Sequence, residues 1–332
     1  MNIAIRTMRY PTGSESKLLD IYNSTRHRGQ CVLLWHGRGP DERDVLAPLA
    51  REIASLGPTV LVPDWRSDRP DDGRGHLTDA LRFARDYTQT FTNPERIVLA
   101  GWSAGAGAAL GVSLHPELFD GWRPAAVVGI AGGYRLPART TGTVPLEMLG
   151  RAVEPVPVRL VHGSADTAVP CDSSRELHEA LSQQGWDSEL YEPASDHAGV
   201  LGCMYEPTVR RCLPAADPSV RDCGRATARV VADAAQSAAR RRDESFRHCR
   251  ALATSATAAA GYLDGAGVGG ATFAGAMVRF NGAKSAGSRV SFSGAQTSHP
   301  SARTAAAVRR AACRWARSPG AGAAVGLLQP WE

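Results

Sequence analysis

Short, largely apolar segments alternate with amphipathic segments along the first 200 residues of the chain. The apolar segments, rich in β-branched residues, span 31–35, 59–62, 96–100, 125–130 and 158–161. The amphipathic segments span 45–56, 76–88, 104–114 and 173–184. Strands that alternate with helices of this length indicate βαβ units and a parallel sheet covered on both faces.

Four further segments complete the expected domain. Residues 3–10 and 17–22 are more polar and suit edge strands, residues 188–191 suit a last strand, and residues 219–238 suit a closing helix. We therefore predict an α/β fold over residues 1–238, with a mostly parallel, doubly wound sheet of about eight strands and helices on both faces.

The chain changes character at about residue 239. Residues 251–332 contain 23 alanines and 12 glycines, and they bury too little apolar surface to offset the entropy of folding. The 13 basic and four acidic residues from position 239 onward more than account for the net charge of +5. The first 238 residues are thus mildly acidic, and the excess basicity belongs to the tail.

This Ala/Gly/Arg-rich segment, residues 239–332, has three interpretations. The plainest is a disordered basic tail. Translation of a GC-rich gene in a shifted frame would give the same composition. A functional tail that binds nucleic acid is the third, and we do not expect it, because the arginines lack interleaved aromatics or a folded motif.

Other features bear on location and cofactors. No uninterrupted apolar stretch approaches the roughly 18 residues of a membrane span, so we expect no membrane partner. The N-terminus lacks the pattern of a secretory signal, which favours a cytoplasmic protein. The seven cysteines form no CxxC pair, so free thiols are expected, with a Cys203–Cys212 bridge as the alternative. No metal-ligand spacing or phosphate-binding glycine pattern occurs, so we expect no cofactor.

Ser103 lies in Gly-Trp-Ser-Ala-Gly, directly after the apolar segment 96–100 and before the small-residue segment 104–114. A serine on such a strand–turn–helix has a strained backbone and an exposed hydroxyl. Bulky neighbours would clash with the crossing strand and helix, so Gly101 and Gly105 are steric requirements. The helix N-terminus favours an oxyanion nearby. Ser103 is therefore the predicted nucleophile.

A serine nucleophile needs a base, and the base needs an orienting group. In sheets of this kind the acid and then the histidine follow the serine along the chain. Asp166 lies in the loop after segment 158–161, at the edge where parallel sheets bind ligands. His197 follows the last predicted strand. We expect His197 to be the general base and Asp166 to orient it.

Several neighbouring residues are assigned structural roles. His36 should hold its own loop in place, and His162 the loop of Asp166. Asp196 is adjacent to the predicted base, so its side chain should diverge from it. Trp102 either walls the pocket or packs beneath the sheet, and we favour packing.

Four motifs in this order resemble those of the α/β-hydrolases. The sequences at 162–170 (HGSADTAVP) and 196–199 (DHAG) are similar to the esterase/lipase, dienelactone-hydrolase and prolyl-oligopeptidase-like branches. The sequence at 35–40 (WHGRGP) resembles the His-Gly-Gly-Gly oxyanion motif of hormone-sensitive-lipase-like esterases, and NPERI at 93–97 is typical of that branch. The resemblance covers about residues 20–205. It implies an α/β-hydrolase with Asp166 and His197 at the family's acid and base positions.

The oxyanion motif departs from the family pattern at Arg38, where such esterases usually carry glycine. A backbone amide remains, so the resemblance implies an oxyanion hole made by the amides of Gly37, Arg38 and Ala104. The Arg38 side chain either adds a cation that favours an anionic or polar substrate, or points into solvent.

These residues predict a serine hydrolase that cleaves carboxyl esters of small soluble substrates through an acyl-enzyme. Residues 132–156 are too few to form a large lid, which favours an open site. Amide, peptide or formamide hydrolysis by the same residues is the closest alternative. A non-catalytic hydrolase-like binding protein is a second alternative, and the intact Ser103, Asp166 and His197 argue against it. The sequence does not predict an oligomeric state.

Overall fold

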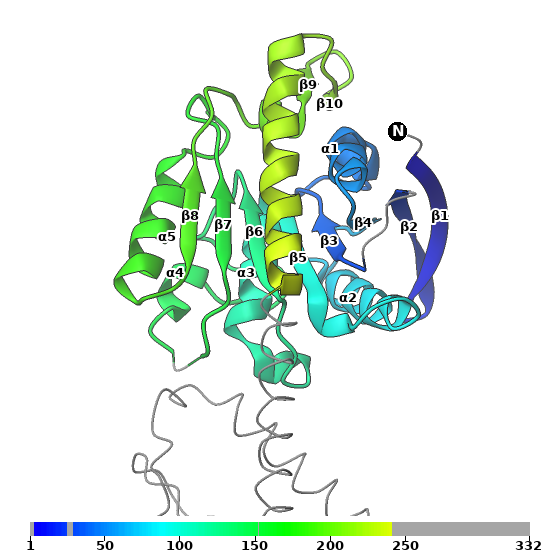
Figure 1. Ribbon diagram of the computed structural model, residues 1–332, viewed down its shortest axis with the longest axis vertical. Helices are drawn as coiled ribbons and strands as arrows, with labels where there is room; N and C mark the ends of the chain where they lie inside the picture. The colour runs from blue at the N-terminus through cyan, green and yellow to red at the C-terminus, as the bar shows by residue number, and fades with distance from the viewer. Residues whose placement is uncertain (1–2, 25–28, 152, 241–332) are drawn as a thin grey trace, which may run out of the picture. The chain divides into compact units, whose positions relative to one another are not determined.

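The computed structural model describes residues 3–24, 29–151 and 153–240 (Figure 1). Most of the predicted tail, residues 241–332, lies outside the described residues. Within the described ranges, no helix combines the length and the apolar character needed to cross a membrane.

An eight-stranded sheet forms the centre of the domain, in the order β1-β2-β4-β3-β5-β6-β7-β8. Strand β2 runs antiparallel to its neighbours β1 and β4, and all other neighbouring strands are parallel. The strands are β1 (Ile3–Thr12), β2 (Glu15–Ser24), β3 (Cys31–Trp35), β4 (Thr59–Pro63), β5 (Ile97–Trp102), β6 (Ala126–Ile130), β7 (Val158–Val161) and β8 (Ser188–Tyr191). The predicted mostly parallel, doubly wound sheet is therefore confirmed.

Helices cover both faces of this sheet (Figure 1). They are α1 (Arg43–Ser55), α2 (Arg74–Thr88), α3 (Ala104–Leu114), α4 (Pro145–Met148) and α5 (Asp172–Gln183), the 3₁₀ turns η1 (Pro94–Arg96), η2 (Pro116–Phe119) and η3 (Gly199–Leu201), and a last helix described over 218–240. One apolar cluster packs α2, α3 and α5 against the sheet, and a second packs α1 and the last helix against its other face.

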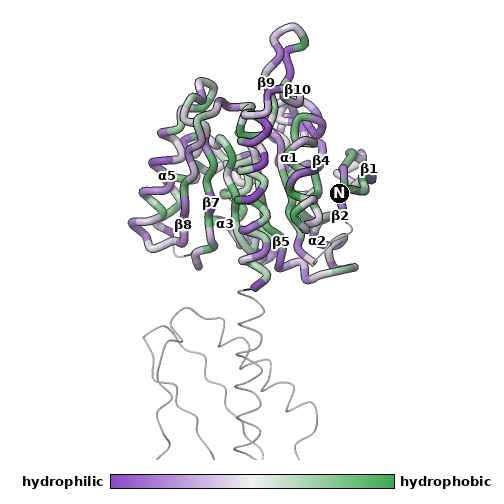
Figure 2. The backbone as a smooth tube through the Cα atoms, turned by 45° about the horizontal axis from the view of Figure 1, so that its top comes forward, coloured by the Kyte–Doolittle hydropathy of each residue, from purple (hydrophilic) through white to green (hydrophobic). Residues whose placement is uncertain are grey.

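The central strands are apolar because both of their faces are buried. Every residue of β3, β4, β5 and β6 is buried, and the tube in Figure 2 shows hydrophobic colour along the interior strands. Alternate residues serve alternate faces: Leu33 and Leu99 join the cluster with α3, whereas Val32 and Val98 join the cluster with α1. The outer strand β8 alternates between half-buried and exposed residues, which explains its more polar sequence.

The direction in which strands are added to the sheet changes at β3. From β3 the chain moves to β4 on one side and then crosses to β5 on the other. Loops on the two sides of such a switch point separate at the carboxyl ends of the strands, where open α/β sheets bind ligands. The predicted oxyanion loop after β3 and the predicted nucleophile after β5 both lie at this point.

A two-stranded hairpin was not predicted from the sequence. It pairs β9 (Cys203–Glu206) with β10 (Arg211–Pro214), so that Tyr205 lies opposite Cys212. All five cysteines in the described ranges are free thiols, so no Cys203–Cys212 bridge forms. The buried Cys203 thiol instead donates to the Val45 carbonyl at 3.4 Å.

Candidate active site

Ser103 lies on the tight turn between β5 and α3. Its φ of 54° and ψ of −119° place it in a region that residues with a side chain rarely occupy. Its amide donates to the Ile130 carbonyl at 2.8 Å, which ties the turn to β6. Such a conformation costs on the order of 1–3 kcal/mol and persists because the surrounding structure imposes it. The strained backbone predicted for this serine is therefore present.

The two glycines flanking Ser103 are required by close backbone approach. A Cβ at Gly101 would lie 2.1 Å from the Gly105 carbonyl oxygen, and a Cβ at Gly105 would lie 2.5 Å from the Trp35 oxygen. All these atoms belong to backbone, which cannot move aside cheaply. The strand β3, the turn and the start of α3 thus approach more closely than any side chain would allow.

Replacing Gly105 with alanine should lower the free energy of unfolding by about 3 kcal/mol, because the added methyl must displace strand β3. Urea unfolding followed by circular dichroism measures this effect. Gly150→Ala is the matched control, since nothing lies within 4 Å of a Cβ at Gly150 and its change should stay within about 0.5 kcal/mol. Equal stability of the two variants would show that the turn can relax.

Asp166 and His197 form a hydrogen-bonded pair. The imidazole Nδ1 lies 2.6 Å from Asp166 Oδ2, and the Asp166 side chain is fully buried. The other carboxylate oxygen accepts the amides of Ala168 and Val169, each at 2.9 Å. Because both oxygens are held, the carboxylate is fixed in orientation and so is the imidazole bound to it.

Burial alone would raise the pKa of Asp166, but its hydrogen bonds outweigh burial. Donors on His162, His197 and the Val169 amide hold the pKa of this carboxyl well below its usual range. The His162 Nε2 atom lies 3.3 Å from Asp166 Oδ2, a contact that sequence reasoning had not assigned. We therefore expect this carboxyl to be ionised at neutral pH.

A pH dependence of stability follows from this lowered pKa. A carboxyl whose pKa is lower in the folded than in the unfolded chain stabilises the fold fully above its unfolded pKa, about 4. That stability is lost as the pH falls from there through the folded pKa. We expect the unfolding free energy difference between wild type and Asp166→Asn to shrink as the pH falls below 4. Urea titrations at each pH measure it, and a difference that does not shrink between pH 4 and pH 2 would contradict the assignment.

Trp102 joins the nucleophile turn to the His197 loop. Its indole Nε1 donates to the His197 carbonyl oxygen at 2.9 Å, and the two rings lie 4.9 Å apart between centroids. Although Trp102 is buried, it also lines the pocket beside Ser103, so the favoured expectation of packing alone was incomplete. The indole fixes the side of the imidazole that Asp166 does not contact.

The other polar residues near the site have the structural roles expected of them. His36 accepts the Trp65 amide at 3.2 Å and stacks on the indole of Trp65. His162 contacts the Ser174 hydroxyl at 2.7 Å and the Val169 carbonyl at 2.8 Å. Asp196 accepts the amides of residues 198 and 199 and turns away from the imidazole.

One pocket of about 590 Å³ brings the predicted site residues together. Ser103, His197, Gly37, Arg38 and Ala104 all line it. Within the described ranges, the amides of the last three have no hydrogen-bond partner and so remain available to a ligand. Ser103 and His197 line the same pocket, and no hydrogen bond joins the Ser103 hydroxyl to the imidazole.

Two segments that sequence reasoning had not placed at the site also line this pocket. They are residues 72–74, after β4, and residues 133–142, after β6. Both follow the carboxyl ends of parallel strands, so the general rule for ligand position in such sheets could have found them.

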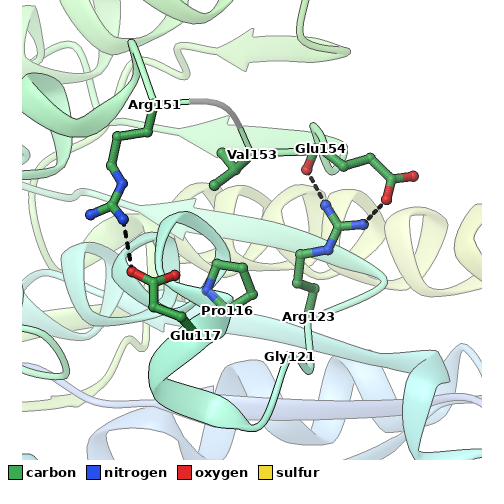
Figure 3. A pocket seen from close by; sticks show the side chains of 7 residues that line it. All are labelled: Pro116, Glu117, Gly121, Arg123, Arg151, Val153 and Glu154. Carbon is green, nitrogen blue, oxygen red and sulfur yellow. Dashed lines mark hydrogen bonds and ion pairs between the residues drawn. The ribbon is translucent and has the colours of Figure 1, made fainter. Parts of the chain in front are cut away.

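A second hollow, about 700 Å³, is open to the surface and is lined by Pro116, Glu117, Gly121, Arg123, Arg151, Val153 and Glu154 (Figure 3). Its charged side chains pair with each other, Arg151 with Glu117 at 2.9 Å and Arg123 with Glu154. The residues that line this hollow include no nucleophilic side chain next to a general base, so they form no catalytic arrangement of the kind seen around Ser103. In the described part of the chain, no group of three or more His, Cys, Asp or Glu residues is placed to hold a metal ion.

The sheet order, the strained serine turn and the position of the pocket define the α/β-hydrolase fold. Solved esterases share it. Thermogutta terrifontis esterase 2, phosphorylated by paraoxon, matches with a TM-score of 0.54 at 19% identity, over 68% of this chain and 91% of its own. Pyrobaculum calidifontis esterase matches with a TM-score of 0.53 at 15% identity, over 71% and 86% of the two chains. No protein-family model and no curated protein sequence matches the chain.

Proposed function

We propose that this protein is a serine hydrolase that cleaves carboxyl esters of small soluble substrates. One observation carries the proposal: a half-buried serine on a strained turn lines the same pocket as a histidine whose Nδ1 atom is hydrogen-bonded to a buried carboxylate. That arrangement supplies the nucleophile, the general base and the orienting acid that acyl transfer needs. The esterase activity of the structural neighbours is consistent with it.

In the proposed mechanism, His197 Nε2 takes the proton of Ser103 as the hydroxyl attacks the substrate carbonyl. Asp166 keeps Nδ1 protonated and stabilises the imidazolium that forms. The imidazolium then gives its proton to the leaving alcohol, and an acyl-enzyme remains. Water, deprotonated by His197, attacks the acyl carbon, and the acid product leaves Ser103 free.

The oxyanion formed in each step would lie against the unpartnered amides of Gly37, Arg38 and Ala104. Each such donor is typically worth on the order of 3 kcal/mol in the transition state. The start of α3 adds its positive dipole end at the same place. Because these amides have no partner among the described residues, no hydrogen bond between described residues has to break before they act.

Labelling by paraoxon tests the nucleophile directly. The full chain is expected to gain one phosphoryl adduct, mapped to Ser103 by peptide mass spectrometry, as well as to hydrolyse short-chain p-nitrophenyl esters. A panel of p-nitrophenyl esters and anilides of equal acyl length separates esterase from amidase activity. Folded protein that neither labels nor turns over any ester would be a binding protein, and the proposal would be wrong.

A further inference from the structure

Three arginines line the mouth of the pocket above the proposed nucleophile: Arg38, Arg74 and Arg139. Arg139 pairs with Asp72 at 2.7 Å. In contrast, the exposed side chains of Arg38 and Arg74 have no acidic partner within the described part of the chain. Two uncompensated guanidinium groups therefore stand at the entrance to the site.

The Arg74 guanidinium lies beside the turn that carries Arg139. A Cβ at Gly142 would lie 2.7 Å from Arg74 Nη2, so the guanidinium lies directly against the backbone of Gly142. Gly142 belongs to the same tight turn as Arg139, closed by its amide on the Ala138 carbonyl at 2.7 Å. The ion pair between Arg139 and Asp72 joins this turn to segment 72–74, which also carries Arg74. The guanidinium groups of Arg74 and Arg139 therefore both lie at the seam, the place where segments 72–74 and 138–142 meet at the mouth of the pocket.

The acidic residues of the pocket do not neutralise this seam. Two acids, Asp72 and Glu42, line the pocket, and neither forms an ion pair with Arg74 or Arg38. Asp72 holds Arg139, and the carboxylate of Glu42 folds beneath the oxyanion loop, where it accepts the Gly39 amide at 3.3 Å and lies 3.7 Å from His36 Nδ1. The mouth keeps an excess of positive charge, carried by donors whose planar fork matches a carboxylate.

We propose that the substrate is an ester carrying a free carboxylate, such as a half-ester of a dicarboxylic acid. The carboxylate would bind Arg74, with Arg139 beside it, while the ester carbonyl reaches Ser103. The apolar lining by Leu136, Pro137 and Val169 suits the methylene chain that joins the two groups. This inference rests on the proposed esterase function and specifies its substrate class.

The test compares two esters of the same shape and different charge. Monomethyl glutarate carries a carboxylate, and the methyl ester of glutaramic acid replaces it with a neutral amide. With the full chain in a pH-stat, the anionic ester should have a kcat/KM at least about 10-fold higher, through a lower KM. The preference should weaken as NaCl is raised from 0.02 to 0.5 M, because salt screens an exposed ion pair.

Substitutions assign the preference to its residue. Arg74→Gln should lower the ratio of the two kcat/KM values by about 5- to 10-fold, and Arg74→Lys should restore part of it. Arg82→Gln is the matched control, an exposed arginine on the same helix outside the pocket, and should leave the ratio unchanged. A wild-type ratio near one, or a ratio unaffected by Arg74→Gln, would overturn this inference and leave the esterase proposal standing. Failure to hydrolyse any ester would overturn both.

Discussion

Replacing Ser103 with alanine is expected to lower kcat for p-nitrophenyl ester hydrolysis by about 10⁴-fold or more. The hydroxyl is the only proposed nucleophile in the pocket. Without it no acyl-enzyme can form, and only the catalysis supplied by the oxyanion donors and by substrate binding remains. Paraoxon labelling should disappear in the same variant. Alanine retains the Cβ and the backbone strain of the turn, so its unfolding free energy should stay within about 0.5 kcal/mol of wild type.

Two further variants separate chemistry from folding. Ser103→Gly also removes the nucleophile, but it should raise the unfolding free energy by about 1 kcal/mol, because glycine adopts a φ of 54° without strain. Ser182→Ala, on the exposed face of α5, should leave both activity and labelling intact. Substantial activity in Ser103→Ala would end the proposed mechanism, whatever the stability of the variant.

Asp166→Asn is expected to lower kcat by about 10⁴-fold while leaving Ser103 in place. An asparagine in this position presents an amide to His197 Nδ1, which favours the imidazole tautomer that cannot accept the serine proton. Steady-state kinetics on the same ester measure the loss, and the rate of paraoxon labelling should fall with it.

Asp196→Asn is the matched control for Asp166→Asn. This neighbouring carboxylate accepts the amides of residues 198 and 199, and the imidazole is not among its partners. We expect a loss of at most about tenfold, through a looser His197 loop. Equal losses in the two variants would mean that the orienting acid has been misassigned.

The order of the fold was predictable because buried parallel strands must be apolar on both faces. Because of that requirement, segments such as 31–35 and 96–100 stand out in the sequence as apolar runs. Their regular alternation with amphipathic segments indicates a parallel sheet. Ser103 directly follows a strand, and Asp166 and His197 lie in the loops that follow two others, so the sequence alone predicts all three at one edge of the sheet. The structure brings Ser103 and His197 into one pocket and pairs His197 with Asp166.

The parts that sequence could not predict depend on contacts between distant residues. The hairpin of β9 and β10 is held through Arg211, whose guanidinium bonds Asp44, 167 positions earlier, and no local pattern indicates such a pair. The seam at the mouth likewise depends on Arg139 meeting Asp72. The ring contact between Trp102 and His197 depends on the course of the loop that carries His197. Irregular loops have no sequence periodicity from which their course could be predicted.

The proposed catalytic groups and the residues that line the mouth of the pocket lie mostly on different segments, and this separation affects how the site can evolve. The proposed oxyanion donors are backbone amides, so among single substitutions only proline, which lacks the amide hydrogen, would remove one of them. Gly101 and Gly105 leave no space for a Cβ. Arg74, Leu136 and Arg139, in contrast, line the pocket from two segments that carry none of the proposed catalytic groups. New substrate preferences can therefore arise by exchanging residues such as Arg74 or Leu136 while the reaction itself is inherited unchanged. A library restricted to the exposed positions 74 and 136 would vary the pocket lining without touching the proposed catalytic groups.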